Sequence, residues 1–453
     1  MRSITIPAET IPVTEEADIC VIGGSCTGLF AAVRAARLGA KVVLLEKHNR
    51  FGGAATAGLV CMWHSIFDIT GERQIIGGLT FEMMERLEKR GAIGEFRKGG
   101  PHVPRIPFNS NELTLELDAL AQEHPQIRTC FHTFYSRPVM NGDGTISAVI
   151  AENKSGRFAV AANFFIDASG DGLLCRAAGY PMRRAGNPQP PTACALLENY
   201  RKAGRIDLKE LIEQNRSRYP DLPCGYSWGT AVPGSDDVYM LSATRILNCD
   251  CMDADAITQA EFESRRQIRA LTSLLRETAP EAHISLQGLP SEIGIRESCH
   301  IVSAGPLRGK EMLAGTCYRD TIGAGTYPVD IHGNADDSIS FLHLTGSRQY
   351  FRSRTLVREE RWLPEGEFLP FYRIPLSCLI PGGAKNLIAA GRMLDADGDS
   401  FGAVRVMVNL NQCGEAAGVA ACCALNSGKA ITEIDGAAVR NELNRGGSLI
   451  PEA

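Results

Sequence analysis

A short apolar strand that runs into a glycine-rich turn constrains the fold of this chain more than any other feature. Residues Ile19–Ile22 form an apolar run, and Gly23-Gly24-Ser25-Cys26-Thr27-Gly28 follows directly. The alanine-rich stretch Leu29–Leu38 then predicts a helix, and Val42–Leu45 predicts a second buried strand. This strand–turn–helix–strand order is typical of a dinucleotide-binding βαβ unit.

The residue types in this unit suit a bound pyrophosphate. Gly23 permits the tight turn, Gly28 lets the helix approach the sheet, and a helix N-terminus attracts an anion. Glu46 ends the second strand, where its carboxylate would accept hydrogen bonds from a ribose. The pattern departs from G-x-G-x-x-G at Ser25, whose hydroxyl would then lie near a phosphate. The nucleotide-binding candidates are Gly23, Gly24, Ser25, Cys26, Thr27, Gly28, Glu46 and Lys47. The alternative is an ordinary glycine-rich turn of an α/β domain.

Length, charge and apolar patterning limit the class of protein. At 453 residues, with 44% hydrophobic and 22% charged residues, the chain is long enough for two or three globular domains. Its net charge of −5 gives no overall attraction to nucleic acid or to an anionic membrane. The N-terminal residues lack a secretory signal, and no apolar run approaches a membrane span. We expect a cytoplasmic protein without nucleic-acid or membrane partners, and the oligomeric state stays open.

The 15 cysteines predict neither disulfides nor a metal site. Seven lie in apolar or alanine-rich contexts, where a thiol behaves as a small core side chain: Cys20, Cys26, Cys175, Cys194, Cys413, Cys422 and Cys423. The sequence has no C-x-x-C pair, and Cys249-Asp250-Cys251 lacks a second ligand pair at a recognised spacing. We therefore expect reduced thiols and no metal.

The segment after the second strand carries a family resemblance. The run Phe51-Gly52-Gly53-Ala54-Ala55-Thr56-Ala57-Gly58-Leu59-Val60 resembles the FAD-dependent oxidoreductase family, within the glutathione-reductase-like flavoproteins and related to the fumarate reductase and tricarballylate dehydrogenase group. The resemblance implies noncovalent FAD and adds Gly52, Gly53, Ala54, Ala55 and Thr56 to the cofactor candidates. His48 and His64 are conceivable points of covalent attachment, but nothing marks either. Cys61 has no partner at the disulfide-reductase spacing, which argues against a dithiol relay.

The same resemblance implies four further cofactor segments. Phe158–Ile166 is an apolar strand that runs into a small-residue turn, which makes Ser169, Gly170 and Asp171 candidates; the alternative is a plain turn with Asp171 as an N-cap. A strand near Val139 would supply backbone contacts to adenine. The run Asn386–Arg392 would return the chain to FAD. A long small-residue helix from Val404 to Leu425 would point its N-terminus at the flavin. These C-terminal segments make Gly391, Arg392, Asp395, Gly402 and Val404 candidates.

Periodicity predicts several other elements. Helices are expected over Leu79–Arg90, over Asn111–Glu123 with Leu115 in its apolar set, and over Ile257–Thr278 with a Thr258–Glu261 capping box. Strands are expected over Arg128–Phe134, Ser147–Glu152 and Val238–Leu247. Residues 183–240 show little periodicity. The predicted fold is α/β: a discontinuous Rossmann-like FAD domain, 1–182 and 369–453, with an inserted α+β substrate or cap domain at 183–368.

Two stretches of the middle region carry candidate chemistry. Tyr327-Pro328-Val329-Asp330-Ile331-His332 places Asp330 and His332 on one face of an extended segment, where the carboxylate would orient the imidazole as a base. Gly294-Ile295-Arg296-Glu297-Ser298-Cys299 resembles a G-[IV]-R-E-S-R run of the family, with cysteine in place of the last arginine. The catalytic candidates are His332, Arg296 and Tyr327. Arg373 and Arg405 are further anion-binding candidates. The alternatives are a satisfied strand histidine and an Arg296–Glu297 ion-pair network.

These features predict an enzyme that moves a hydride between a small organic substrate, an anionic one included, and N5 of FAD. Gly323-Ala324-Gly325 starts like a second dinucleotide turn, but Pro328 stands at its third glycine position and no apolar strand precedes it. An NAD(P)H site is therefore not expected, and the electron acceptor stays unknown. The alternatives are a tRNA-modifying flavoprotein, a non-catalytic FAD-binding protein and a simple NAD dehydrogenase.

Overall fold

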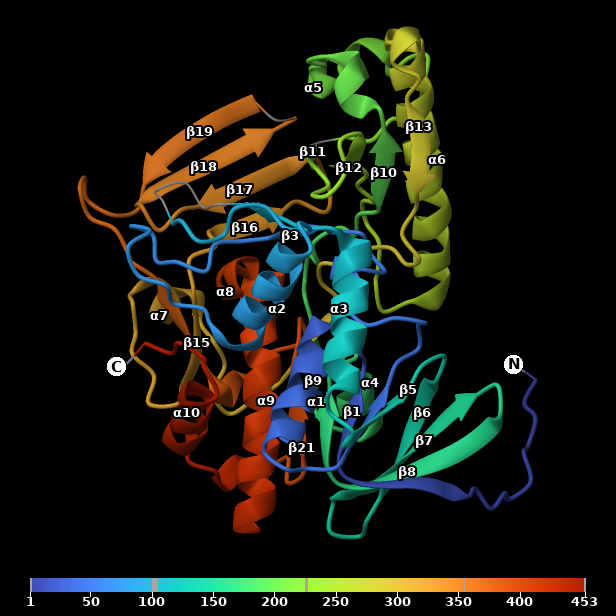
Figure 1. The fold of residues 1–453 in the computed structure, drawn as a ribbon, viewed down its shortest axis with the longest axis vertical. Helices are drawn as coiled ribbons and strands as arrows, with labels where there is room; N and C mark the ends of the chain where they lie inside the picture. Colours follow the sequence, from blue (N-terminus) through green and yellow to red (C-terminus); the bar gives the residue numbers. More distant parts are fainter. Residues whose placement is uncertain (1, 100–104, 225–226, 354, 452–453) are drawn as a thin grey trace.

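A seven-stranded sheet forms the base of the molecule (Figure 1). The computed structural model describes residues 2–99, 105–224, 227–353 and 355–451. The strand order is β5-β2-β1-β8-β7-β6, and β21 pairs with the end of β8 on the edge that faces away from β1. The pairs β1–β2, β2–β5, β1–β8 and β8–β21 are parallel, whereas β6, β7 and β8 form an antiparallel meander. The strands are β1 (Val13–Ile22), β2 (Val42–Leu45), β5 (Ile127–Cys130), β6 (Phe134–Met140), β7 (Ile146–Asn153), β8 (Gly156–Asp167) and β21 (Leu387–Ala389).

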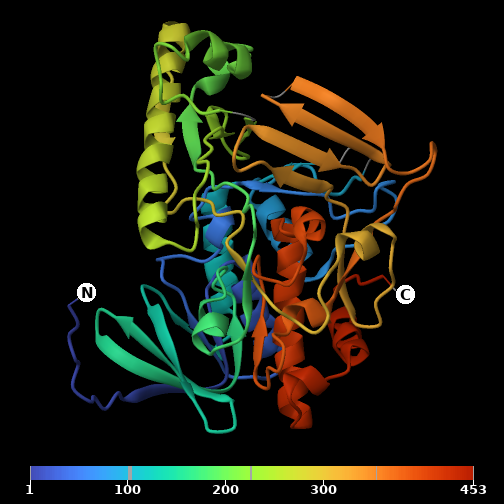
Figure 2. The same cartoon turned by 180° about the vertical axis from the view of Figure 1, so that it is seen from behind.

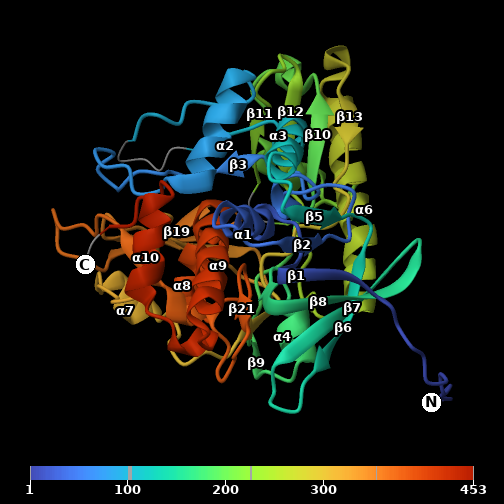
Figure 3. The same ribbon diagram turned by 60° about the horizontal axis from the view of Figure 1, so that its bottom comes forward.

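Helices cover the parallel part of this sheet because its strands are apolar on both faces. Ile19, Cys20 and Val21 of β1 are fully buried, and all of β2 is buried. Helix α1 packs along α9, and the two helices lie side by side in Figures 1 and 3. The helices of this layer and of the neighbouring C-terminal region are α1 (Cys26–Arg37), α2 (Gly78–Lys89), α3 (Ser110–Gln122), α4 (Leu173–Ala177), α8 (Gly398–Val404), α9 (Met407–Ser427) and α10 (Gly436–Arg445).

The middle of the chain builds two antiparallel sheets above this base, and Figure 2 shows both at the same end of the molecule. One has the order β11-β12-β10-β13, with the long helix α6 beside it. The other has the order β16-β17-β18-β19. The elements of this region are β9 (Met182–Arg184), β10 (Cys194–Glu198), α5 (Leu208–Asn215), β11 (Trp228–Ala231), β12 (Val238–Ser242), α6 (Ala254–Thr278), β13 (Ser285–Gly288), β14 (Cys299–Ile301), α7 (Gly309–Leu313), β15 (Thr321–Gly325), β16 (Val329–His332), β17 (Ser338–Leu342), β18 (Ser347–Arg352), β19 (Thr355–Arg361) and β20 (Tyr372–Pro375).

Three short pairings tie these layers together. Strand β14 pairs with β9, β15 pairs with β20, and β3 (Met62–Trp63) pairs with β4 (Ile106–Pro107). Strand β16, which carries the Asp330–His332 motif, lies against α8 at the start of the C-terminal helices. The antiparallel sheets therefore lie next to the part of the nucleotide-binding region that the C-terminal helices form.

The structure corrects several local expectations. The helix expected over Val404–Leu425 is α9, which begins three residues later, at Met407, because Val406 has an extended backbone and is its N-cap. Helix α6 begins at Ala254 with Asp253 as its N-cap, so the expected Thr258–Glu261 capping box is wrong. Leu115 is 53% exposed and does not belong to the core face of α3. Residues 183–240, expected to be irregular, contain β10, α5 and β11 together with parts of β9 and β12.

A buried ion pair locks α1 to α9. Arg34 Nε donates to Glu415 Oε2 at 2.7 Å, and both side chains are at most 5% exposed. Arg34 also reaches the Gly446 carbonyl and Ser448 at the C-terminus, while Glu415 accepts from the Leu79 amide at the start of α2. Burial raises the pKa of Glu415, and Arg34 opposes that rise. One ion pair therefore joins four segments that are distant in sequence.

Replacing one member of this pair should leave an uncompensated buried charge. We expect Glu415→Leu to lower the free energy of unfolding by about 3–5 kcal/mol, and Arg34→Met/Glu415→Leu to recover much of that loss. Glu442→Gln, which removes the exposed Arg445–Glu442 pair of α10, should cost less than about 1 kcal/mol. Urea unfolding of the four proteins measures these differences. An equal loss in Glu415→Leu and Glu442→Gln would contradict the role of burial.

Candidate active site

The end of β1 forms a nucleotide cradle with no room for extra side chains. Gly23 has φ +102°, and a Cβ there would lie 2.3 Å from the Ala168 carbonyl oxygen. A Cβ on Gly28 would lie 1.9 Å from the Gly23 carbonyl oxygen. Both glycines are therefore required by close backbone approach, as the sequence pattern predicted.

The acidic residue at the end of β2 closes this cradle. Glu46 is 6% exposed, and its carboxylate accepts hydrogen bonds from the amides of Gly24 at 2.6 Å and His48 at 2.7 Å. Thr133 N donates to the Glu46 carbonyl, which brings the segment before β6 to the same place. A carboxylate held this way retains lone pairs for ribose hydroxyls.

Ser25 caps helix α1, a role that the glycine at this position of G-x-G-x-x-G could not fill with a side chain. Its Oγ accepts from the Gly28 amide at 3.4 Å as the N-cap of α1, and the residue forms a parallel bridge with Gly52. The cap satisfies one amide of the first turn, and the remaining amide N–H groups of a helix N-terminus favour an anion. Cys26 and Thr27 are buried in this turn, and Cys26 Sγ lies 3.8 Å from the Gly52 carbonyl oxygen.

The Gly-Gly segment crosses in front of the cradle. Gly52 has φ +107° and Gly53 has φ +53°, and a Cβ on Gly53 would lie 2.9 Å from Ser25 Cβ. The chain then makes a short 3-10 turn over Gly53–Ala55, and Ala55 and Thr56 are buried. Ala54 lies within the same turn. These small residues keep the backbone close to the turn at Ser25.

The small-residue turn after β8 and the segment after β21 are joined by one ion pair. Arg392 Nη2 lies 2.6 Å from Asp171 Oδ1, and a Cβ on Gly170 would lie 2.5 Å from the Arg392 guanidinium. Arg392 Nε is buried without a hydrogen-bond partner in the described chain. Ser169 Oγ donates to Asp167 at 2.7 Å, and Gly391 takes φ +131°. Asp171 therefore does not cap α4, whose N-cap is Gly172.

Some cofactor candidates have other roles. Val139 is 40% exposed on the edge strand β6, and the structure does not bring it to Glu46; the Phe131–Thr133 segment lies there instead. The Asp395 carboxylate is engaged by Ser303 and Arg183. A Cβ on Gly402 would lie 3.2 Å from the Asp330 amide, so this glycine allows α8 to approach β16, and Val404 is fully buried in α8.

One carboxylate of the middle region, that of Glu292, contacts two residues that follow β2. Glu292 lies 2.8 Å from Lys47 Nζ and 2.9 Å from His48 Nε2. Burial opposes ionisation of Glu292, but His48 and Lys47 lower its pKa to about 2. Lys47 is therefore part of a contact between the inserted region and the nucleotide unit, and His48 is held in the same contact.

Asp330 on β16 is the centre of a polar group that also contains Tyr327, His332 and Arg405. Tyr327 Oη donates to Asp330 Oδ2 at 2.7 Å, Arg405 Nη2 lies 2.8 Å from the same oxygen, and His332 Nε2 lies 3.2 Å from Oδ1. Burial opposes ionisation of Asp330, but His332 and Arg405 hold the pKa of its carboxyl well below its usual range. The predicted pairing of Asp330 with His332 is present in the structure.

This arrangement favours a neutral imidazole at His332. Burial lowers the pKa of His332 to about 4, and Arg296 and Arg405 act in the same direction against the opposing effect of Asp330. Nε2 is the ring nitrogen nearest Asp330, so a neutral ring that carries its proton on Nε2 presents Nδ1 as its proton acceptor. The His332 amide donates to Gln189 Oε1 at 3.2 Å, which fixes the backbone beside the ring.

Arg296 is not part of an ion pair with Glu297. Its Nη1 donates to the Pro190 carbonyl at 2.5 Å and to Thr192 Oγ1 at 2.6 Å, whereas Glu297 is engaged by the Gln189 amide and His300. The expected alternative of an Arg296–Glu297 network is therefore wrong. Cys299, which replaces the family arginine, is buried with its Sγ 2.9 Å from the Asp171 carbonyl oxygen.

His64 belongs to this group, although sequence reasoning considered it only for flavin attachment. Its ring centroid lies 4.2 Å from that of Tyr327, and burial lowers its pKa to about 3 despite the opposing effect of Asp330. Only the long-range contact between the segment after β3 and the segment before β16 brings the two rings together, and no local pattern signals it. Arg373, by contrast, packs over the Phe371 ring.

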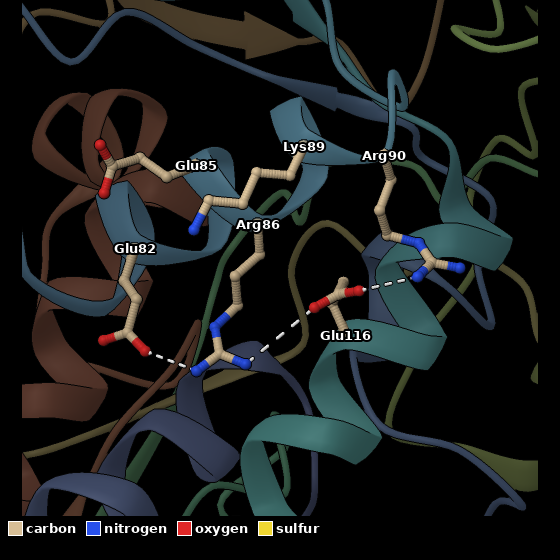
Figure 4. Close-up of a pocket in the computed structure, with 6 residues that line it drawn as sticks. All are labelled: Glu82, Glu85, Arg86, Lys89, Arg90 and Glu116. Carbon is tan, nitrogen blue, oxygen red and sulfur yellow. Dashed lines mark hydrogen bonds and ion pairs between the residues drawn. The ribbon is translucent and has the colours of Figure 1, made fainter.

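A charged surface hollow of about 520 Å³ is a separate feature (Figure 4). It lies over α2 and α3 and is lined by Glu82, Glu85, Arg86, Lys89, Arg90 and Glu116. Arg86 pairs with Glu82, and Arg90 pairs with Glu116 at 3.3 Å. Because its charges balance each other, the hollow offers no excess charge to a ligand. Among the residues that the structure describes, no cluster could hold a metal ion, and no helix is long and apolar enough to cross a membrane.

The chain belongs to the FAD dependent oxidoreductase family, whose model matches residues 18–443. FAD is therefore its cofactor, and it is an FAD-dependent oxidoreductase. The cradle at Gly23 and Gly28, the free lone pairs of Glu46 and the unpartnered Arg392 Nε fit a dinucleotide. No curated protein matches the sequence significantly.

Solved structures resemble this one at low identity. A geranylgeranyl bacteriochlorophyll reductase-like protein of Thermoplasma acidophilum is 14% identical, with a TM-score of 0.46 over 95% of this chain and 82% of that one. The p-nitrophenol 4-monooxygenase PnpA of Pseudomonas putida is 10% identical, with a TM-score of 0.45 over 93% and 84%. The myxobacterial chondrochloren halogenase CndH is 14% identical, with a TM-score of 0.43 over 95% and 79%. Such identities are too low to transfer a substrate.

Removing the Arg392 guanidinium should weaken FAD binding. We expect Arg392→Met to raise the dissociation constant of FAD at least tenfold, about 1.4 kcal/mol, because a partly buried cation beside the cradle would be lost. The measurement is quenching of FAD fluorescence during titration of the apoprotein. Arg184→Met, which removes an arginine that is 65% exposed and paired with Asp250, should bind FAD normally. Equal affinities in the two variants would exclude Arg392 from the cofactor site.

The two buried histidines should make the protein acid-sensitive. His332 and His64 have folded-state pKa values of about 4 and about 3, below their ordinary value of 6.5, so the unfolded chain binds protons first as pH falls. We expect the free energy of unfolding to fall between pH 6.5 and 4, by on the order of 2–3 kcal/mol for His332. His332→Asn should remove that share, and His283→Asn, at an exposed histidine, should not. Urea unfolding across this pH range measures both, and identical slopes would contradict the assignment.

Proposed function

We propose that the protein transfers a hydride between a small organic substrate and N5 of FAD, with His332 as the base. Bound FAD supplies the two-electron acceptor or donor. The observation that carries the proposal is the Asp330–His332 pair at 3.2 Å, held in a buried group with Tyr327 and Arg405.

Hydride transfer to the flavin is accompanied by loss of a proton from the substrate, and residues of this chain fit the role of the base that takes it. A base must be unprotonated at working pH, and the lowered pKa of His332 keeps its ring neutral. The Asp330 carboxylate lies 3.2 Å from Nε2 and would stabilise the imidazolium once Nδ1 has taken a proton. Tyr327 orients Asp330 and is a positioning residue in this proposal, not a proton donor, because burial and Asp330 hold its pKa well above the usual range.

The C-terminal elements support the placement of this group near the flavin. Arg405 caps α8 and directly precedes the N-cap of α9, and α9 packs along α1, whose N-terminus opens into the cradle. The positive end of a helix stabilises a reduced, anionic flavin. Arg296 reaches the same group from the middle region and would bind substrate or stabilise charge there.

Replacement of His332 tests the proposal. Anaerobic screening of carboxylic, hydroxy and amine compounds first identifies a substrate that bleaches the flavin. We then expect His332→Asn to lower the rate of flavin reduction by about 10²–10⁴-fold while FAD content stays normal. In the native enzyme, kcat/KM should fall only as the pH drops through about 4, since His332 must be neutral. His283→Asn is the matched control. Unchanged reduction by His332→Asn would remove His332 from catalysis.

A further inference from the structure

Three arginines from separate parts of the chain converge on the Asp330 group. Arg245 follows β12, Arg296 lies in the segment before β14, and Arg405 ends α8. Arg245 is 4% exposed, and the Arg405 side chain is 12% exposed. Burial, with Arg405 and Arg245 nearby, lowers the pKa of Arg296 to about 10, so all three remain cations at neutral pH.

The protein does not saturate these guanidinium groups. Arg245 Nη2 donates to the Ser338 carbonyl at 3.1 Å, but its Nε and Nη1 are buried without partners in the described chain. Arg405 Nε is buried without a partner in the same residues. Arg296 donates through Nη1 to a carbonyl and a hydroxyl, neither of which carries a charge. Buried N–H donors without acceptors are unfavourable, so these unused guanidinium nitrogens indicate a site for a ligand that accepts hydrogen bonds.

Counting charges around the group indicates how much negative charge is missing. Asp330 is the carboxylate in contact with Arg405. Asp336 and Asp337 face Arg245 from the loop after β16 and also pair with Arg352, at 3.3 and 3.8 Å. The four arginines and three aspartates leave at least one positive charge, because the adjacent histidines are neutral, and Arg105 is a further cation that acts on His64. The group therefore has an excess of positive charge that an anionic ligand would offset.

We propose that Arg245, Arg296 and Arg405 bind the carboxylate of an organic acid substrate and place its neighbouring carbon beside His332. This inference rests on the proposed hydride transfer and names the class of compound on which it acts. A carboxylate supplies one negative charge and accepts several N–H donors at once, which the free guanidinium nitrogens provide. Arg245 thereby gains a binding role that no sequence motif indicated.

The decisive experiment measures binding without turnover. Oxidised holoenzyme is titrated with two- to four-carbon organic acids, with their matched neutral amides and with inorganic phosphate. The readouts are perturbation of the flavin absorbance and the shift in melting temperature. We expect at least one acid to bind tenfold or more tightly than its amide and than phosphate. Equal binding of acid and amide, preference for phosphate, or no binding of any acid would overturn the proposal.

Variants connect the binding to the named residues. Arg245→Met and Arg296→Met should each weaken acid binding at least tenfold, whereas Arg266→Met, at an exposed position of α6, should not. Without acid, Arg245→Met should melt at the native temperature or higher, because it removes an unneutralised buried cation. Undiminished binding in Arg245→Met would overturn its assignment. If that variant does not fold, Arg245→Lys, which keeps the charge and loses the planar fork, should bind the acid more weakly than the native protein.

The outcomes separate this inference from the proposed function. Acids that bind through the three arginines but never bleach the flavin would support the anion site and contradict hydride transfer. A neutral compound that reduces the flavin, together with absent acid binding, would support hydride transfer and overturn the anion site.

Discussion

The close approach of α9 to α1 is the constraint on which the active site depends. A Cβ on Gly414 would lie 2.1 Å from the Thr27 carbonyl oxygen, and one on Gly418 would lie 2.2 Å from that of Ala31. The helices therefore meet backbone to backbone, in a fixed register. Because α1 begins at the nucleotide cradle and α9 begins beside Arg405, this register fixes the distance between the cofactor turn and the Asp330 group. The Arg34–Glu415 pair holds the same two helices further along.

The nucleotide unit could be predicted from sequence because its determinants are local. Val42–Leu45 matches β2 residue for residue, and Gly23 and Gly28 are required where the turn pattern placed them. The predicted helix start at Val404 lies three residues before that of α9, because no local pattern marks the extended backbone of Val406. In the middle region the strands are short, and pairings such as β9–β14, β10–β13 and β15–β20 join segments far apart in the chain, so local periodicity was weak there.

The same difference between local and long-range determinants explains which candidate residues could be predicted. The spacing of Asp330 and His332 predicted their contact, because alternate residues of a strand share a face. Arg245 and His64 escaped notice because each is a single residue in an unremarkable stretch, brought to the site only by tertiary packing. Val139 rests on the family analogy alone. It is 40% exposed on the edge strand β6, and its backbone contact with adenine stays a prediction.

Strand β21 has a consequence for how the protein is made. Its residue Leu387 pairs with Phe165 of β8, so the edge of the nucleotide sheet is completed by a segment translated more than two hundred residues later. Until then, β8 exposes an unpaired apolar edge, and α9 is not yet available to cover α1. Pairings this distant in sequence form slowly. The nucleotide sheet and the α1–α9 contact are therefore complete only once the C-terminal segment has been synthesised.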